Sequence, residues 1–210
     1  MLSRGLEKYN EKTLVLLKPD VVQRGLMGEI ISRFEKKGLK IAAMKMVWAS
    51  EEMALKHYTW PEHAMIALGE RTIAVYKDRG IEENRTAKEI ALDIQKKLVR
   101  YLSAGPLVAI VLEGAHAIAY VRKMRGSVNT LGADLGSITA DYTVDSYFIS
   151  DEDDRSARTL VHASGSVEEA GMEIPIWFGE EEIYSYNLAI DEILYSRQWE
   201  DTYRHLISKK

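Results

Sequence analysis

The stretch RTLVHASGSVEE, residues 158–169, sets a histidine inside a short apolar run and follows it at once with small residues. The apolar run is typical of a buried strand, and residues 163–165 leave open space beside the imidazole of His162. Ser166, with Glu169 three residues later, forms a capping-box pattern and predicts the start of a helix. A lone histidine in an apolar strand is more often a hydrogen-bonded core residue than a reactive one. This stretch alone therefore leaves both interpretations open.

The composition of the whole chain narrows the functional classes. The 210 residues are 46% hydrophobic and 29% charged, which is typical of one globular domain over residues 1–210. Cysteine is absent, which excludes disulfides, thiolate catalysis and cysteine-based zinc sites. A net charge of -4 argues against nucleic acid as a partner and favours small anionic ligands. With no long apolar run and no signal-peptide core, we expect a cytoplasmic protein without a membrane segment.

Four apolar runs are typical of buried strands: residues 13–17, 39–48, 107–112 and the run before His162. Helical spacing connects them over residues 25–37, 50–58, 86–102, 115–125 and 166–178. This order predicts an α/β (α+β) fold of the ferredoxin-like βαββαβ type, with a four-stranded antiparallel sheet and surrounding helices. A doubly wound parallel sheet is the alternative. That fold usually has more strands and a glycine-rich first turn, whereas this chain has Lys18-Pro19-Asp20 there.

Two segments extend this pattern. Residues 59–104 are rich in charge and helix signals, and they predict an inserted helical hairpin. Residues 180–210 predict a C-terminal helical extension, with one helix over residues 183–207. Residues 126–140 are loop by composition and lack the GxxxxGK[ST] pattern of a P-loop, and residues 151–154 are most simply a solvated acidic turn.

Three stretches resemble the nucleoside diphosphate kinase family. They are KPDVVQRGLMGEIISRFEKKGLKI at residues 18–41, AGP at residues 104–106 and LVHASGSVEEAGMEIPIWF at residues 160–178. The chain is identified as a member of that family. The resemblance implies a phosphotransferase that moves the terminal phosphate of a nucleoside triphosphate to a nucleoside diphosphate. It also implies Mg²⁺ bound mainly through the nucleotide phosphates, with no metal ligand on the protein, and assembly as a homo-oligomer.

The resemblance also implies roles for individual residues. His162 corresponds to the family's nucleophile, which becomes phosphohistidine, and Glu173 to the carboxylate that accepts a hydrogen bond from the other ring nitrogen. Lys18 corresponds to the lysine that approaches the transferred phosphoryl group, where a cation meets spread negative charge. Three further positions correspond to residues around the substrate: Tyr58, Arg122 and Ser164.

The chain departs from the family in its phosphate-binding loop. The family usually has a threonine and an arginine after Arg122 and an asparagine before the histidine, where this chain has Val128, Thr139 and Thr159. The usual loop proline is Thr130. An arginine–phosphate contact is worth on the order of 1.5 to 3 kcal/mol, so its loss would weaken catalysis, and Thr139→Arg is expected to tighten diphosphate binding.

These departures leave an alternative hypothesis: a weakened or inactive nucleotide-binding or assembly protein that kept the fold. Against it, the nucleophile, carboxylate, lysine and tyrosine positions are all retained. Three nearby cations could also take over part of the lost contact: Lys123, Arg125 and Arg158. The aromatic residue that stacks on the base is not assigned, because residues 59–104 are longer than the family's counterpart.

Overall fold

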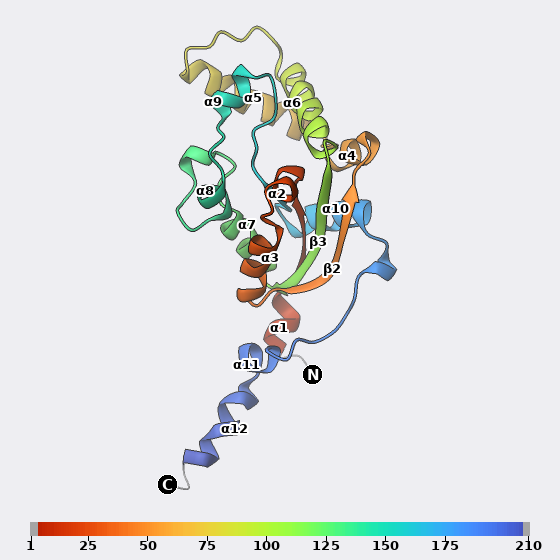
Figure 1. Cartoon of the computed structure of the whole chain (residues 1–210), viewed down its shortest axis with the longest axis vertical. Helices are drawn as coiled ribbons and strands as arrows, with labels where there is room; N and C mark the ends of the chain where they lie inside the picture. The colour runs from red at the N-terminus through yellow and green to blue at the C-terminus, as the bar shows by residue number, and fades with distance from the viewer. Residues whose placement is uncertain (1–3, 208–210) are drawn as a thin grey trace.

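A computed structural model describes residues 4–207 of the chain (Figure 1). Its centre is a four-stranded antiparallel sheet in the order β2-β3-β1-β4. The strands are β1 Asn10–Leu17, β2 Lys40–Trp48, β3 Pro106–Ala115 and β4 Val161–Ala163. The order and the antiparallel pairing confirm the predicted ferredoxin-like fold. The parallel alternative is excluded.

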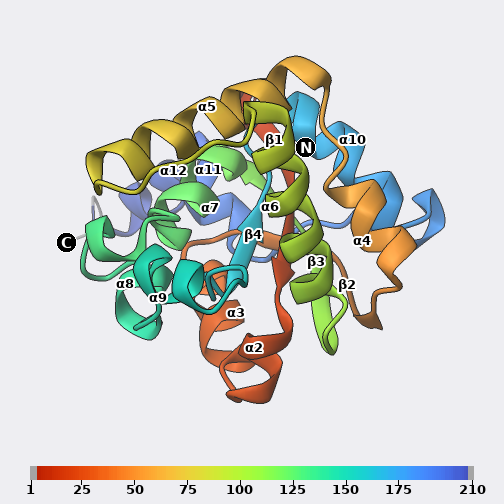
Figure 2. The ribbon, with the colours of Figure 1, turned by 90° about the horizontal axis from the view of Figure 1, so that it is seen from above.

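The central strands have apolar residues on both faces because helices cover both faces of the sheet. On one side Leu14 and Leu16 of β1 pack with α4 Glu51–His57, α6 Ala87–Leu102 and α10 Val167–Trp177. On the other side Val15 and Leu17 pack with α2 Pro19–Gln23, α3 Met27–Lys36, α7 Ala117–Arg125 and α8 Ile138–Tyr142. Figure 2 shows α4 and α10 on one flank of the strands and α3, α7 and α8 on the other. The continuous apolar runs follow from this double burial.

The predicted hairpin of residues 59–104 is present as α5 Glu62–Asp78 packed against α6. Thr86 closes the capping box with Glu89 that the sequence predicts. The hairpin lies at one end of the sheet, next to α9 Tyr147–Glu152 (Figure 1). Asp151 of α9 accepts from Arg79 and from the Tyr76 hydroxyl. Part of the predicted acidic turn is therefore a helix that holds the hairpin.

The prediction of a single C-terminal helix over residues 183–207 is wrong. The chain forms η2 Glu180–Glu182, an extended segment, α11 Asp191–Tyr195 and α12 Arg197–Ile207, and it starts with a short helix, α1 Arg4–Tyr9. The extended segment runs beside β2, where the Tyr184 amide donates to the Ala42 carbonyl at 2.8 Å. The Tyr186 hydroxyl donates to the Ile41 carbonyl at 2.8 Å. These two bonds hold the segment against the edge of the sheet in place of a helix. Residues 208–210 of the predicted extension lie outside the described residues.

The predicted loop at residues 126–140 contains two short elements, η1 Thr130–Gly132 and the start of α8. Among the described helices, none has the length and apolar character needed to cross a membrane.

Candidate active site

His162 lies in the middle of β4, opposite Leu16 of β1. The residue two places before it, Leu160, is buried and has a φ of 62°, in the left-handed region that a branched side chain rarely adopts. The Leu160 carbonyl accepts from the Lys18 amide at 2.9 Å, so the strained turn joins the start of β4 to the end of β1. The pairing fixes His162 and Lys18 at the same end of the sheet. Local strain of this kind concentrates at functional sites.

Glu173 and Ser164 hold the imidazole in one orientation. His162 Nε2 lies 3.1 Å from Glu173 Oε2, and the same oxygen accepts from Ser164 Oγ at 2.6 Å. Ser164 is fully buried and its Oγ also accepts from the Leu14 amide at 3.2 Å. A proton on Nε2 satisfies the carboxylate and leaves a lone pair on Nδ1. No described residue forms a hydrogen bond to Nδ1, so the second nitrogen is available for chemistry.

Burial, together with nearby cations, keeps His162 neutral. Burial lowers the pKa of His162 to about 3, with further lowering by the charges of Lys18, Arg125 and Arg122. Burial raises the pKa of Glu173 above its ordinary value, although the Ser164 hydrogen bond opposes that rise. With a neutral imidazole, the contact to Glu173 is a hydrogen bond rather than an ion pair. A neutral imidazole with a free nitrogen is a nucleophile at physiological pH.

Lys18 follows β1 directly, as the N-cap of α2, and is 4% exposed. Its Nζ donates to Thr159 Oγ1 at 2.8 Å and lies 5.0 Å from the centre of the Tyr101 ring. Burial lowers its pKa to about 8; the charges of Arg125 and Arg158 lower it further, and Asp20 opposes them. Thr159, where the family usually has asparagine, therefore positions the lysine. A buried ammonium without an ion-pair partner is suited to meet an anion.

Tyr58 is the C-cap of α4 and is 5% exposed, and its hydroxyl has no hydrogen-bond partner among the described residues. The residue before it, His57, is also buried and its ring stands edge-on to the His162 ring, with the centres 4.3 Å apart. Its Nδ1 accepts from Trp177 Nε1 at 3.4 Å. Sequence reasoning placed Tyr58 near the site but missed His57. The signal was available, because the two residues are adjacent at the end of one helix.

Arg122 reaches the site from the last turn of α7. One of its terminal nitrogens lies 3.0 Å from the place where a Cβ on Gly165 would stand. A glycine at 165 thus lets the guanidinium approach the turn that follows β4. The structure therefore brings together all six residues that the resemblance singled out: His162, Glu173, Lys18, Tyr58, Arg122 and Ser164.

The loop positions that depart from the family have defined structural roles. Val128 is 46% exposed, whereas Thr139 is 1% exposed and donates from Oγ1 to the Arg125 carbonyl at 2.8 Å. Thr130 donates to the Asp145 carbonyl. An arginine at 139 would have to leave this buried place to reach a phosphate. The geometry therefore does not support the expected benefit of Thr139→Arg.

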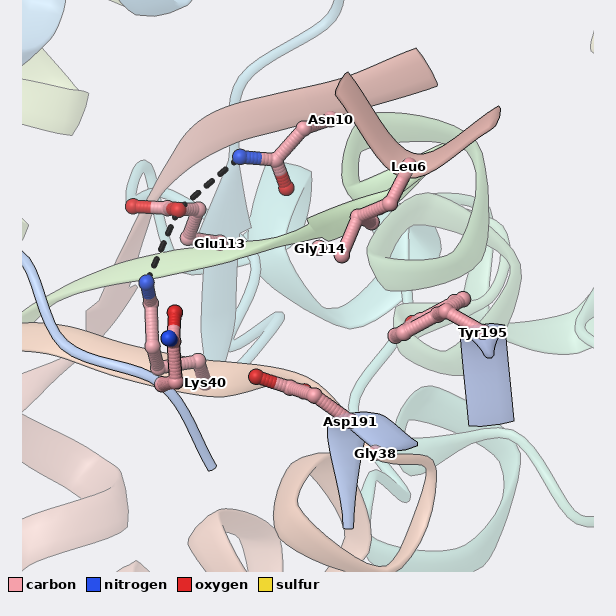
Figure 3. A pocket seen from close by; sticks show the side chains of 9 residues that line it. Leu6, Asn10, Gly38, Lys40, Glu113, Gly114, Asp191 and Tyr195 are labelled. Carbon is pink, nitrogen blue, oxygen red and sulfur yellow. Dashed lines mark hydrogen bonds and ion pairs between the residues drawn. The ribbon is translucent and has the colours of Figure 1, made fainter. Parts of the chain in front are cut away.

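A small cavity lies near the beginning of β1, where Asn10, Lys40 and Glu113 face one another (Figure 3). Glu113 Oε1 accepts from Lys40 Nζ and from Asn10 Nδ2, both at 2.9 Å. The cavity has a volume of about 20 Å³, which is room for a water molecule and not for a nucleotide. His162 lies near the other end of β1, so this cavity is separate from the candidate site.

Comparison with known proteins agrees with this geometry. The profile of a family described as nucleoside diphosphate kinase matches residues 11–67 and 87–183. The chain belongs to this family. A nucleoside diphosphate kinase of Pyrobaculum aerophilum is 44% identical over 178 residues, covering 82% of this chain and 97% of the relative. One from Pyrococcus abyssi is 40% identical over 185 residues, covering 88% and 94%.

Solved structures of family members have the same fold. The crystal structure of an NDP kinase from Pyrobaculum aerophilum has a TM-score of 0.81 and 42% identity, and the match covers 84% of this chain and all of that one. A transition state mimic of nucleoside-diphosphate kinase from Borrelia burgdorferi, with bound vanadate and ADP, has a TM-score of 0.72 and 31% identity over 89% and 97% of the two chains. The family profile leaves residues 68–86 unmatched, which are the last part of α5 and the connection to α6.

Proposed function

We propose that this protein transfers the terminal phosphate of a nucleoside triphosphate to a nucleoside diphosphate through a phosphohistidine on His162. The observation that carries the proposal is the bond between His162 Nε2 and Glu173, which leaves Nδ1 free on an imidazole that feels the charges of three cations: Lys18, Arg122 and Arg125. Family membership and the vanadate- and ADP-bound relative support the same reaction. The alternative, a nucleotide-binding protein without activity, is not favoured because the nucleophile and its orienting carboxylate are assembled.

The transfer proceeds in two half-reactions. In the first, the Nδ1 lone pair of His162 attacks the terminal phosphorus, an N–P bond forms and the bond to the bridging oxygen breaks, releasing the diphosphate. In the second, a terminal oxygen of a different diphosphate attacks the phosphorus and the N–P bond breaks. Glu173 stabilises the positive charge that develops on the ring, as an orienting base partner does. Lys18 and Arg122 meet the negative charge of the transferred group.

The residues around His162 are consistent with a divalent cation that is bound by the nucleotide phosphates rather than by the protein. Mg²⁺ prefers oxygen ligands and commonly binds substrate phosphates with few protein ligands. The only cluster of potential metal ligands found among the described residues is His57, His162 and Glu173, with ligand atoms within 4.8 Å of one another. It is rich in nitrogen, and the charges of Lys18 and Arg122 act on it. Mg²⁺ bound to the phosphates would neutralise part of their charge.

We also infer the domain organisation and self-association expected from the sequence. The hairpin of residues 59–104 belongs to the single domain, because Leu102 of α6 packs in the same core as β1. Self-association is supported by the part of β2 beyond the bonds to the C-terminal segment, where Met44, Met46 and Trp48 are 52%, 58% and 69% exposed. Light scattering coupled to size exclusion measures the assembly, and a monomer at micromolar concentration would contradict it. The cytoplasmic location stays a prediction of the sequence.

The decisive experiment is the mass of the intact protein after incubation with ATP and Mg²⁺. We expect one added phosphoryl group that is labile to acid, and none in His162→Ala. The matched control is His63→Ala, since His63 is an exposed histidine near the start of α5 and should leave phosphorylation unchanged. Wild-type protein without an added phosphoryl group would refute the proposed reaction.

A further inference from the structure

We propose that Arg125 binds the phosphates of the nucleotide and supplies the cation that the loop lacks at position 139. The inference rests on the proposed function, because it assigns a ligand contact within the same site. It concerns a residue that lies outside the six positions carried over from the family.

Arg125 shares the last turn of α7 with Arg122. Residues three apart on a helix lie on the same face. Helix α7 packs against β4, which holds His162, and against β1, which Lys18 follows directly. The charge of Arg125 acts on both Lys18 and His162 and lowers the pKa of each. Arg125 thus lies one helical turn from Arg122, on the helix that packs against the strand of the nucleophile.

The guanidinium of Arg125 lacks an anion. Among the described residues, no carboxylate forms an ion pair with Arg125, and its only side-chain hydrogen bond runs from Nε to the Gly126 carbonyl at 3.1 Å. Burial, followed by the charge of Arg122, lowers its pKa. A partly buried arginine is normally paired, since an isolated charge is costly to remove from water. Its four remaining N–H groups can form the bidentate contacts that arginine makes with phosphate.

Thr139 connects this cation to the departure in the loop. Its buried hydroxyl donates to the Arg125 carbonyl, so the residue at the place of the family's arginine braces the backbone of Arg125. Gly126 continues the brace: it has a φ of 88°, and a Cβ there would stand 2.4 Å from Ser137 Oγ. The close approach of the two segments requires a glycine. In this chain the cation of the loop is thus Arg125 rather than an arginine at position 139, and Thr139 fixes the backbone of Arg125 through its hydrogen bond.

The other two candidate cations fit this role less well. Lys123 is exposed and forms no ion pair with any described residue, and its charge is not among those that lower the pKa of His162. Arg158 stacks on Tyr101 with its guanidinium 4.5 Å from the ring centre, and its charge acts on Lys18 but not on His162. Arg125 is the one of the three whose charge lowers the pKa of both the lysine and the nucleophile.

The test compares Arg125→Gln and Arg125→Lys with Lys123→Gln as the matched control. Calorimetry measures the binding of ADP with Mg²⁺, and steady-state kinetics separate kcat from KM. We expect Arg125→Gln to lose roughly 10- to 150-fold in kcat/KM, as expected for one charge-assisted contact, with partial rescue in Arg125→Lys. Lys123→Gln should stay within twofold of wild type. Arg125→Gln within threefold of wild type in both ADP affinity and kcat/KM would overturn the inference.

A double-mutant cycle tests the brace. Thr139→Val keeps the shape of the side chain and removes the hydroxyl, so it should weaken ADP binding several-fold in wild type and have no further effect in Arg125→Gln. Equal effects in both backgrounds would contradict the coupling. Phosphorylation of the wild type on His162 is measured separately. If it is absent, the proposed function fails, whereas if it is present and Arg125→Gln is unimpaired, only the role of Arg125 fails.

Discussion

Lys18 should set the alkaline limit of activity. Its pKa is about 8, so roughly one-tenth of the lysine carries a charge at pH 9, whereas an ordinary lysine would be almost fully charged there. If the ammonium is needed to meet the phosphates, kcat/KM for the diphosphate should fall about tenfold between pH 7 and pH 9, because kcat/KM reports groups of the free enzyme. His162, with a pKa of about 3, stays neutral over this whole range and contributes no change.

The control is Lys18→Arg. A guanidinium stays charged above pH 12, so the variant should have a lower plateau, because its geometry differs, but no fall between pH 7 and pH 9. Tyr58 and Tyr101 cannot produce the fall in kcat/KM between pH 7 and pH 9, since burial raises the pKa of both hydroxyl groups. A flat wild-type profile to pH 9.5, or the same fall in Lys18→Arg, would refute the assignment.

The same shift predicts an effect on stability. The folded protein has a Lys18 pKa of about 8 against 10.5 in the unfolded chain, which corresponds to roughly 3 kcal/mol of destabilisation at pH 7. Between these two pKa values the unfolded chain binds more protons, so this penalty fades as the pH rises. Lys18→Met should therefore raise the free energy of unfolding at pH 7 by up to about 3 kcal/mol, less the lost bond to Thr159, and by much less at pH 10.5. Urea denaturation at both pH values measures the difference, and equal gains at both would contradict it.

Three further predictions concern the supports of the site. Glu173→Gln should slow phosphorylation of His162 by about 10- to 100-fold, since a charge-assisted bond becomes a neutral one. The exposed control Glu168→Gln should leave the rate unchanged. Single-turnover mass spectrometry measures both rates, and equal rates would contradict the orienting role of Glu173. Gly126→Ala should weaken ADP binding and lower the free energy of unfolding by at least about 1 kcal/mol, because a φ of 88° and the close approach of Ser137 are unsuited to a side chain. An unchanged Tm would contradict this expectation. Asp151→Asn should lower Tm by about 2 to 4 °C without changing kcat, as expected when a half-buried ion pair to the hairpin is removed; a changed kcat would show that the hairpin affects the chemistry.

Much of the fold could be predicted because its signals are local. The apolar runs at β1 and β3 are continuous since both faces of those strands are buried, and the capping residues Ser166 and Thr86 start helices where the sequence placed them. The contact between His162 and Glu173 joins residues only eleven apart, across one strand end and one helix. Short-range geometry of this kind follows from the motif.

The parts that could not be predicted depend on distant contacts. The C-terminal segment has helical composition, but the Tyr184 amide donates to the Ala42 carbonyl at the edge of β2, about 140 residues away in the sequence. The backbone of Arg125 accepts a hydrogen bond from Thr139, a residue that the sequence could describe only as a missing arginine. The left-handed backbone of Leu160 has no sequence signal at all, because leucine is a residue that avoids it.

The unsatisfied groups of the site argue that its form is set by a ligand. Five buried side-chain atoms in the described residues lack a hydrogen-bond partner, and three of them belong to residues around the nucleophile: Asp20, His57 and Tyr58. Native proteins leave few such groups, because each costs about 1 to 3 kcal/mol. Near them lie the buried Lys18 and the half-buried Arg125, which form no ion pair among the described residues, and a strained Leu160. A sequence selected for stability alone would remove these features. Their concentration around one imidazole is explained if a bound polyphosphate completes the contacts that the folded chain leaves open.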